Sequence, residues 1–270
     1  METTLQMQII VSRDGTPIAC WRSGQGPALV MVHGTTADHN RWRSVLPLLE
    51  PHATVYVMDR RGRGASGDRA EYALENEAAD VAAVVDAVSD ATGEPVDLFG
   101  HSYGAHCALE AALQTNAMRR LVLYEPAIRA VSPPGWLDRM ASLLAQDRRE
   151  EVVVSLLCDL AGVTGEQLDR MKADPSWAGR VAAAHTVVRE TRAEEEYRFD
   201  PLRFAALRVP ILLLAGAQSA PGLAESTAVL AAGLPGARVV TMAGQGHVAM
   251  LTAPDLFAAE LLGFLHADQD

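Results

Sequence analysis

The chain has 270 residues, a hydrophobic content of 49% and a formal net charge of −11, which is enough sequence for one large α/β domain or two small ones. The acidic balance argues against nucleic acid or an anionic membrane as the main partner, because both attract basic surfaces. Cys20, Cys107 and Cys158 are widely spaced and form no C-x-x-C pair, so neither a disulfide framework nor a zinc site is indicated. We expect reduced thiols and a cytoplasmic protein. The first residues lack the pattern of a signal peptide, and no apolar run reaches transmembrane length.

Short apolar runs alternate with helix-forming stretches along the first half of the chain. The turn signal Asp14-Gly15 indicates a hairpin at one edge of a sheet, and continuous apolar runs are typical of strands buried on both faces. The expected elements are an antiparallel pair (5–11 and 17–21), a strand at 28–32, a short helix at 41–49, a strand at 54–58, an amphipathic helix at 75–91, a strand at 96–99, a helix from 105 and a strand at 121–124.

The pattern changes between residues 127 and 201, where helical periodicity replaces strand-like runs. Helices are expected at 136–144, 151–160, 166–171 and 177–196, and alternation then resumes with strands at 209–215 and 238–242 and helices at 222–232 and 255–265. We interpret residues 1–126 and 202–270 as one core and residues 127–201 as a helical insertion. Alternating strands and helices imply a mostly parallel sheet, whose ligand sites lie at the carboxyl ends of the strands.

The sequence Gly100-His101-Ser102-Tyr103-Gly104 lies between a predicted strand and a predicted helix. This is the context of a G-x-S-x-G elbow, in which a sharp turn exposes the serine. Glycines two residues to either side remove side chains that would collide with neighbouring backbone. The pattern therefore predicts Ser102 as a nucleophile.

Four motifs together resemble the α/β-hydrolase fold over nearly the whole chain apart from the insertion. They are Val30-Met-Val-His-Gly-Thr35, Asp59-Arg-Arg-Gly-Arg-Gly64, Gly100-His-Ser-Tyr-Gly104 and Gly244-Gln-Gly-His247. The resemblance implies a mostly parallel eight-stranded sheet flanked by helices, with the insertion after the sixth strand acting as a cap. It also implies Ser102 as nucleophile, His247 as base, and an oxyanion hole made by the backbone N–H groups of Thr35 and Tyr103.

The acid of the triad departs from the common pattern of this family. Many relatives carry an aspartate after the seventh strand, but the corresponding loop here, Gly216-Ala-Gln-Ser-Ala-Pro221, has no carboxylate. Glu125 follows the sixth strand and keeps the usual chain order Ser, acid, His, so it is the preferred candidate. The alternatives are a structural Glu125 that ties down the insertion, and Glu225, which we expect on a solvated helix surface.

Several other residues have less specific signals. The expected lining of a substrate pocket is Met31, Trp136, Met140, Trp177, His185 and Val248. His33 and His101 are expected to brace loops by hydrogen bonds. Arg60, Arg61 and Arg63, beside Asp59, are expected to form a salt-bridged loop rather than a phosphate site.

The sequence therefore predicts a hydrolase that uses no cofactor and no metal. It would cleave a small or medium apolar ester, lactone or thioester through an acyl-Ser102 intermediate, with a small molecule as its only expected partner. The oligomeric state is left open. Two alternatives also stay open: use of the same Ser and His for carbon–carbon cleavage, acyl transfer or cyclisation, and a receptor-like protein with little turnover. A serine at the elbow disfavours an epoxide hydrolase or haloalkane dehalogenase, since those relatives use aspartate there.

Overall fold

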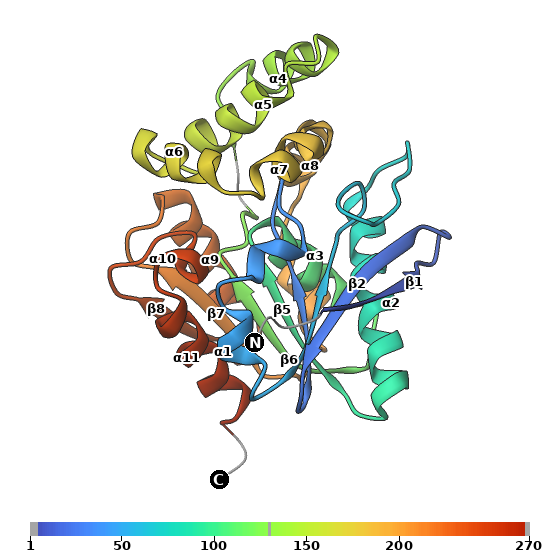
Figure 1. Ribbon diagram of the computed structural model, residues 1–270. Helices are drawn as coiled ribbons and strands as arrows, with labels where there is room; N and C mark the ends of the chain where they lie inside the picture. The colour runs from blue at the N-terminus through green and yellow to red at the C-terminus, as the bar shows by residue number, and fades with distance from the viewer. Residues whose placement is uncertain (1–4, 129–130, 268–270) are drawn as a thin grey trace.

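Eight strands form one sheet in the computed structural model, which describes residues 5–128 and 131–267 (Figure 1). The order across the sheet is β1-β2-β4-β3-β5-β6-β7-β8; β2 pairs antiparallel with β1 and β4, and every other neighbouring pair is parallel. The eight-stranded, mostly parallel sheet is therefore confirmed. The strands are β1 (Gln6–Val11), β2 (Pro17–Gly24), β3 (Ala28–Val32), β4 (Thr54–Met58), β5 (Val96–His101), β6 (Met118–Tyr124), β7 (Ile211–Gly216) and β8 (Arg238–Met242).

Helices cover both faces of the sheet because successive side chains of a buried strand point to opposite sides. In β3, Val30 and Val32 pack into a core shared with α2, α3 and α9, whereas Leu29 and Met31 pack into a core shared with α1 and α11. The helices of this core are η1 (His39–Trp42), α1 (Leu46–Leu49), α2 (Leu74–Thr92), α3 (Tyr103–Ala111), η4 (Pro201–Phe204), α9 (Pro221–Gly233), α10 (Ala249–Thr252) and α11 (Pro254–Leu265).

The helical insertion lies above the carboxyl ends of the strands, between β6 and β7 in the sequence (Figure 1). It has a small apolar core of its own, in which Trp136, Met140, Val153 and Val187 take part. Its elements are α4 (Trp136–Ala145), α5 (Arg149–Ser155), the π-helical turn η2 (Leu156–Leu160), α6 (Gly165–Ala173), α7 (Trp177–Ala182), η3 (Ala183–Thr186) and α8 (Val187–Glu196). Residues 129–130, within the predicted insertion, lie outside the described residues, as do the chain ends 1–4 and 268–270 of the predicted core.

Three predicted helices are interrupted in the structure, and the stretch 151–160 changes from α5 to the π-helical turn η2 at Leu156. The stretch 41–49 divides into η1 and α1, and Pro47 stands in the first turn of α1, where its missing N–H costs least. The stretch 177–196 divides into α7, η3 and α8. The edge strand β1 is more exposed than its alternation suggested, since Met7, Ile9 and Val11 are each about half exposed or more.

The arginine-rich loop after β4 is salt-bridged, as expected, but not to Asp59. Arg60 donates to both carboxylate oxygens of Glu77 in α2 at 3.0 and 2.5 Å, and Arg61 donates to both oxygens of Asp80 at 2.6 and 2.7 Å. Asp59 instead binds His39: its Oδ1 accepts the backbone N–H of His39 and lies near the ring Nδ1, each at 2.8 Å. Arg60 and Arg61 are thus paired with carboxylates of helix α2, which argues against a phosphate site in this loop.

A buried carboxylate of the insertion joins this arginine loop to α8. Glu190 has no exposed surface; its Oε1 accepts from Arg63 and lies 3.2 Å from Arg60 Nη2. Burial alone would raise the pKa of Glu190, but the positive charges of Arg60 and Arg63 outweigh it and hold the pKa below its ordinary value of 4.5. The contact therefore fixes one helix of the insertion to the core.

The lowered pKa of Glu190 predicts a pH-dependent contribution to stability. A depressed carboxylate pKa stabilises the folded state above the unfolded pKa, and this stabilisation is lost as the pH falls through the two values. We expect Glu190→Gln to lower the free energy of unfolding at pH 7. At pH 4 the difference in this free energy between the parent and the variant, the gap, should be about 1 kcal/mol smaller. Urea unfolding at the two pH values measures this gap. Glu196→Gln, at an exposed position of the same helix, is the control and should show no such change. A gap for Glu190→Gln that grew on acidification would contradict the assignment.

Candidate active site

Ser102 lies at the sharp turn between β5 and α3. Its backbone has φ 56° and ψ −127°, a conformation that residues other than glycine rarely adopt. The neighbouring glycines allow the turn: a Cβ on Gly100 would lie 2.5 Å from Ala105 Cα, and one on Gly104 would lie 2.3 Å from the His33 carbonyl oxygen. The predicted steric reason for the two glycines is therefore confirmed.

The loop after β3 passes directly beside Ser102. A Cβ on Gly34 would lie 2.8 Å from Ser102 Cβ, and the next residue, Thr35, is partly exposed. Tyr103 is the first residue of α3, so its N–H has no partner within the helix. Within the described part of the chain, neither Thr35 N–H nor Tyr103 N–H donates a hydrogen bond outside a helix or strand. Both groups are free to bind a negatively charged oxygen near Ser102.

Glu125 and His247 form a direct hydrogen bond although they are 122 positions apart. His247 Nδ1 lies 2.7 Å from Glu125 Oε2, and Glu125 Oε1 accepts the backbone N–H of Gly216 at 2.6 Å. The Glu125 side chain is 1% exposed and that of His247 is 16% exposed. Glu125 thus reaches from the end of β6 to the end of β7, the loop that lacks a carboxylate of its own. Glu225 is exposed on α9.

Two buried side chains hold the loop that carries His247. The Tyr124 hydroxyl donates to the Gly246 carbonyl and accepts from Ala249 N at 3.1 Å. His101 Nε2 lies 2.8 Å from the His247 carbonyl oxygen, and the two rings are 4.6 Å apart between centroids. Burial, followed by the nearby His247 charge, lowers the pKa of His101 well below its ordinary value, so the ring stays neutral and donates from Nε2. This is the bracing role that the sequence predicts for His101.

His33 braces the adjacent loop in the same way. Its Nδ1 lies 2.8 Å from the Gly34 carbonyl oxygen, and its Nε2 accepts the backbone N–H of Arg60 at 3.2 Å. Burial lowers the pKa of His33 well below its ordinary value, and a neutral ring is what an accepting Nε2 requires. The expected bracing by His33 is confirmed.

The structure brings Ser102, Glu125 and His247 to one edge of the sheet. Ser102 N donates to Tyr124 O at 2.9 Å, which places the elbow beside the residue that precedes Glu125. Within residues 5–128 and 131–267, Ser102 Oγ and His247 Nε2 make no hydrogen bond to each other or to another group. Active sites without substrate often show this looser geometry, because the contact tightens only when substrate binds.

Three of the six residues expected to line a substrate pocket lie instead in apolar cores. Met31 and Met140 have no exposed surface, and Trp136 is 2% exposed. Met31 points to a face of the sheet rather than to its edge, so it packs against the helices below. Trp136 and Met140 pack inside the insertion. The structure therefore places these three residues mainly in apolar cores, and their role as a pocket lining stays a prediction.

The other three also stay predictions. Val248 adjoins His247 and is half-buried, and Trp177 is partly buried with the Lys172 ammonium 5.7 Å from its ring centroid. His185 is exposed, and its Nε2 lies 3.4 Å from Asp68. The His185 ring therefore faces the loop after β4.

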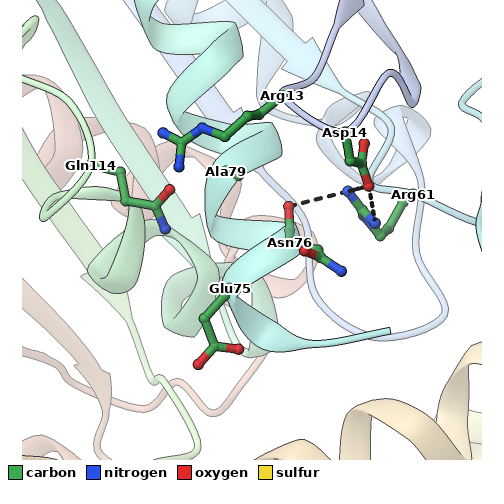
Figure 2. A pocket seen from close by; sticks show the side chains of 7 residues that line it. All are labelled: Arg13, Asp14, Arg61, Glu75, Asn76, Ala79 and Gln114. Carbon is green, nitrogen blue, oxygen red and sulfur yellow. Dashed lines mark hydrogen bonds and ion pairs between the residues drawn. The ribbon is translucent and has the colours of Figure 1, made fainter. Parts of the chain in front are cut away.

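A surface hollow elsewhere on the core holds none of the predicted site residues. Figure 2 shows that it lies beside α2 and that Arg13 and Arg61 both line it; Arg61 is already bound to Asp14 at 3.1 Å. No helix in the described ranges is long and apolar enough to cross a membrane. The same ranges contain no cluster of three or more His, Cys, Asp or Glu side chains that could hold a metal ion.

Sequence reasoning missed two buried arginines near the site, Arg41 and Arg180. Arg41 belongs to η1 after β3, and Arg180 belongs to α7 of the insertion. Each is an arginine in a short helix, a pattern that is typical of a solvated surface. No signal in the sequence separates them from exposed arginines.

Comparisons with known proteins agree with this fold. A family model described as the alpha/beta hydrolase family matches residues 29–260. The crystal structure of an alpha/beta hydrolase from Sphaerobacter thermophilus is 36% identical, with a TM-score of 0.82 over 96% of this chain and all of that one. A pimeloyl-[acyl-carrier protein] methyl ester esterase from Xanthomonas campestris is 28% identical over 90% of this chain and 97% of that protein.

A second curated relative matches over a shorter stretch. An N-formylmaleamate deformylase from Pseudomonas putida is 38% identical over 115 residues, which is 42% of this chain. The match spans 41% of the length of that deformylase, and a match with a Methylococcus capsulatus methyl ester esterase spans 42% of that protein.

The contact at Gly104 predicts a specific loss of stability. An added methyl group would meet the backbone carbonyls of Val32 and His33, which cannot move without shifting β3. We expect Gly104→Ala to lower the free energy of unfolding by about 2 kcal/mol, measured by urea denaturation. Gly263→Ala in α11, where nothing lies near the added Cβ, is the control and should stabilise slightly through helix propensity. Equal stability of Gly104→Ala and the parent would contradict the close approach.

Proposed function

This chain belongs to the alpha/beta hydrolase family, and from that premise we propose that it is a serine hydrolase that forms an acyl-Ser102 intermediate. The observation that carries the proposal is the Glu125–His247 hydrogen bond of 2.7 Å at the sheet edge where the Ser102 elbow stands. A carboxylate on Nδ1 fixes the tautomer whose Nε2 can accept the proton of a serine hydroxyl.

The proposed chemistry follows from these positions. His247 Nε2 takes the Ser102 proton as Oγ attacks the acyl carbon, and the carbonyl oxygen becomes negatively charged. The N–H groups of Thr35 and Tyr103 would stabilise that charge, and each would lower the activation barrier by about 3 kcal/mol. The tetrahedral intermediate collapses, the leaving group takes the proton from His247, and water then attacks the acyl-enzyme with the same base.

The names of the relatives support acyl transfer to water. The Xanthomonas campestris relative is a methyl ester esterase and the Pseudomonas putida relative is a deformylase. We therefore propose a small or medium ester, lactone or thioester as the substrate of this chain. In this proposal the helical insertion is a cap, since α4–α8 lie above the edge of the sheet where Ser102 stands (Figure 1). No cofactor takes part in these steps.

Labelling with a fluorophosphonate tests the nucleophile. The folded protein should be labelled at one site, because a serine beside a paired imidazole attacks phosphorus readily. Ser102→Ala should abolish labelling while keeping the thermal midpoint of the parent, and the labelled peptide identified by mass spectrometry should contain Ser102. A folded parent that resists labelling would instead favour a receptor-like protein with little turnover.

Replacement of Glu125 tests the acid. Glu125→Gln keeps the shape of the side chain but no longer fixes the His247 tautomer, so kcat for a p-nitrophenyl ester should fall by about 10⁴-fold. Glu225→Gln, which changes the exposed alternative candidate on α9, is the matched control and should keep the activity of the parent. Normal turnover by Glu125→Gln would mean that another group orients His247.

A further inference from the structure

Arg41 and Arg180 are buried without any partner. Their side chains are 9% and 7% exposed. Among the described residues, neither guanidinium makes a hydrogen bond or an ion pair, and Arg41 Nε and Arg180 Nη1 are fully enclosed donors. A buried guanidinium ordinarily has a carboxylate partner, because an unpaired buried charge is strongly destabilising.

The rest of the chain follows this rule. Arg60 and Arg61 each hold a carboxylate of α2 through two hydrogen bonds, and Arg63 holds Glu190. Each of these three buried arginines therefore has a carboxylate partner, although Arg63 Nε itself makes no hydrogen bond to any described residue. Arg41 and Arg180 are exceptions that structural stability does not explain.

Neighbouring charges do not neutralise the pair. Burial lowers the pKa of Arg180 to about 10, and burial followed by the nearby charge of Arg180 lowers the pKa of Arg41 well below its ordinary value. Asp38 and Asp174 act in the opposite direction but lie beyond ion-pair distance. Each of these carboxylates accepts a backbone N–H of its own turn, Asp38 from Asn40 at 2.9 Å and Asp174 from Ser176 at 2.8 Å.

The two arginines flank the contact between the insertion and the core. Arg180 lies in α7 next to Gly179, where an added Cβ would be 3.1 Å from Asp38 Oδ2 at the start of η1. Arg41 comes from η1 itself. An anion between the two guanidinium groups would therefore be held by both layers of the molecule at once.

This contact is close to the candidate active site. Trp42, the residue after Arg41, packs edge-on against the His101 ring at 6.4 Å between centroids, and His101 binds the His247 carbonyl. The charges of Arg41 and Arg180 both contribute to the lowered pKa of His101, after burial and His247. The positive field of the pair thus reaches the residue that adjoins Ser102.

We propose that Arg41 and Arg180 form a subsite for a carboxylate carried by the substrate, so that the ester that Ser102 attacks belongs to a half-ester, or to a lactone or thioester of a dicarboxylic acid. This inference rests on the proposed function and replaces the apolar substrate expected from the sequence with an anionic one. The planar guanidinium group presents two parallel N–H donors, and this geometry matches the two oxygens of a planar carboxylate. The positive charges of Arg41 and Arg180 are offset in part by the carboxylates of Asp38 and Asp174, so the subsite favours a ligand group with one negative charge.

A matched pair of substrates tests the subsite. p-Nitrophenyl hydrogen glutarate carries the carboxylate, and p-nitrophenyl methyl glutarate has the same chain with the charge removed. We expect kcat/KM of the parent to favour the anion by about 30-fold, chiefly through KM, since a charge-assisted hydrogen bond adds about a factor of 10 to 100 in affinity.

Variants of the two arginines should remove this preference selectively. Arg180→Gln and Arg41→Gln should lower kcat/KM for the anionic ester by about 30-fold and change that for the neutral ester less than threefold. Arg180→Lys should recover part of the loss, because it restores the charge without the fork. Arg149→Gln is the control, an exposed arginine of the insertion that is paired with Asp147; it should keep the preference of the parent.

Binding to an inactive protein separates the subsite from the chemistry. Ser102→Ala should bind glutarate in calorimetry, and Ser102→Ala/Arg180→Gln should bind it at least tenfold more weakly, with inorganic phosphate as the competing anion. Glutarate binding without hydrolysis of either ester, and without fluorophosphonate labelling, would overturn the proposed function and keep the subsite. Two results would overturn the subsite alone. The first is fluorophosphonate labelling together with equal rates for both esters and glutarate binding that does not depend on Arg180. The second is tighter binding of phosphate than of glutarate.

Discussion

The close approach of the first turn of α3 to the end of β3 determines the arrangement of the whole site. Gly104 lies against the carbonyls of Val32 and His33 so tightly that a single methyl group would not fit. The turn before it therefore carries Ser102 up against Gly34, beside Thr35, whose N–H we propose to act with that of Tyr103 on the negatively charged oxygen. The strained backbone of Ser102 is held by this packing and by its N–H bond to Tyr124.

Tyr124 and Glu125 extend the same constraint to His247, the proposed base. They are consecutive residues at the end of β6: one holds the His247 loop through Gly246 and Ala249, and the other binds the imidazole itself. The proposed acid can follow β6 rather than β7 because Glu125 also accepts the Gly216 N–H at the end of β7. The Glu125 carboxylate, which follows β6, therefore lies at the end of the neighbouring strand β7.

Buried charge is managed in two ways in this molecule. Arg60, Arg63, Glu77 and Glu190 compensate one another between the core and α8, which holds the insertion in place. Arg41 and Arg180 have no such compensation where α7 meets η1. The contrast between arginines that have carboxylate partners at α8 and two that have none among the described residues at α7 is the reason for proposing that these two bind a ligand.

The sequence was informative where backbone geometry dictates residue type. The strand–glycine–serine–glycine–helix pattern, the buried strands and the position of Glu125 after β6 could be predicted because sterics and chain order leave few options. The pocket could not, because Met31, Trp136 and Met140 have the same apolar spacing whether they face a cavity or a core. Arg41 and Arg180 gave no signal, since burial and the absence of a partner are properties of the folded chain alone.

The identity of the atom that carries the acyl group tests the proposed mechanism most directly. Rapid acid quenching during turnover of a p-nitrophenyl ester, followed by peptide mass spectrometry, locates that group. A serine mechanism predicts an acyl adduct on Ser102 in the parent during turnover and no adduct in Ser102→Ala. Turnover that continues with no adduct on Ser102, or with the adduct on another side chain, would contradict it.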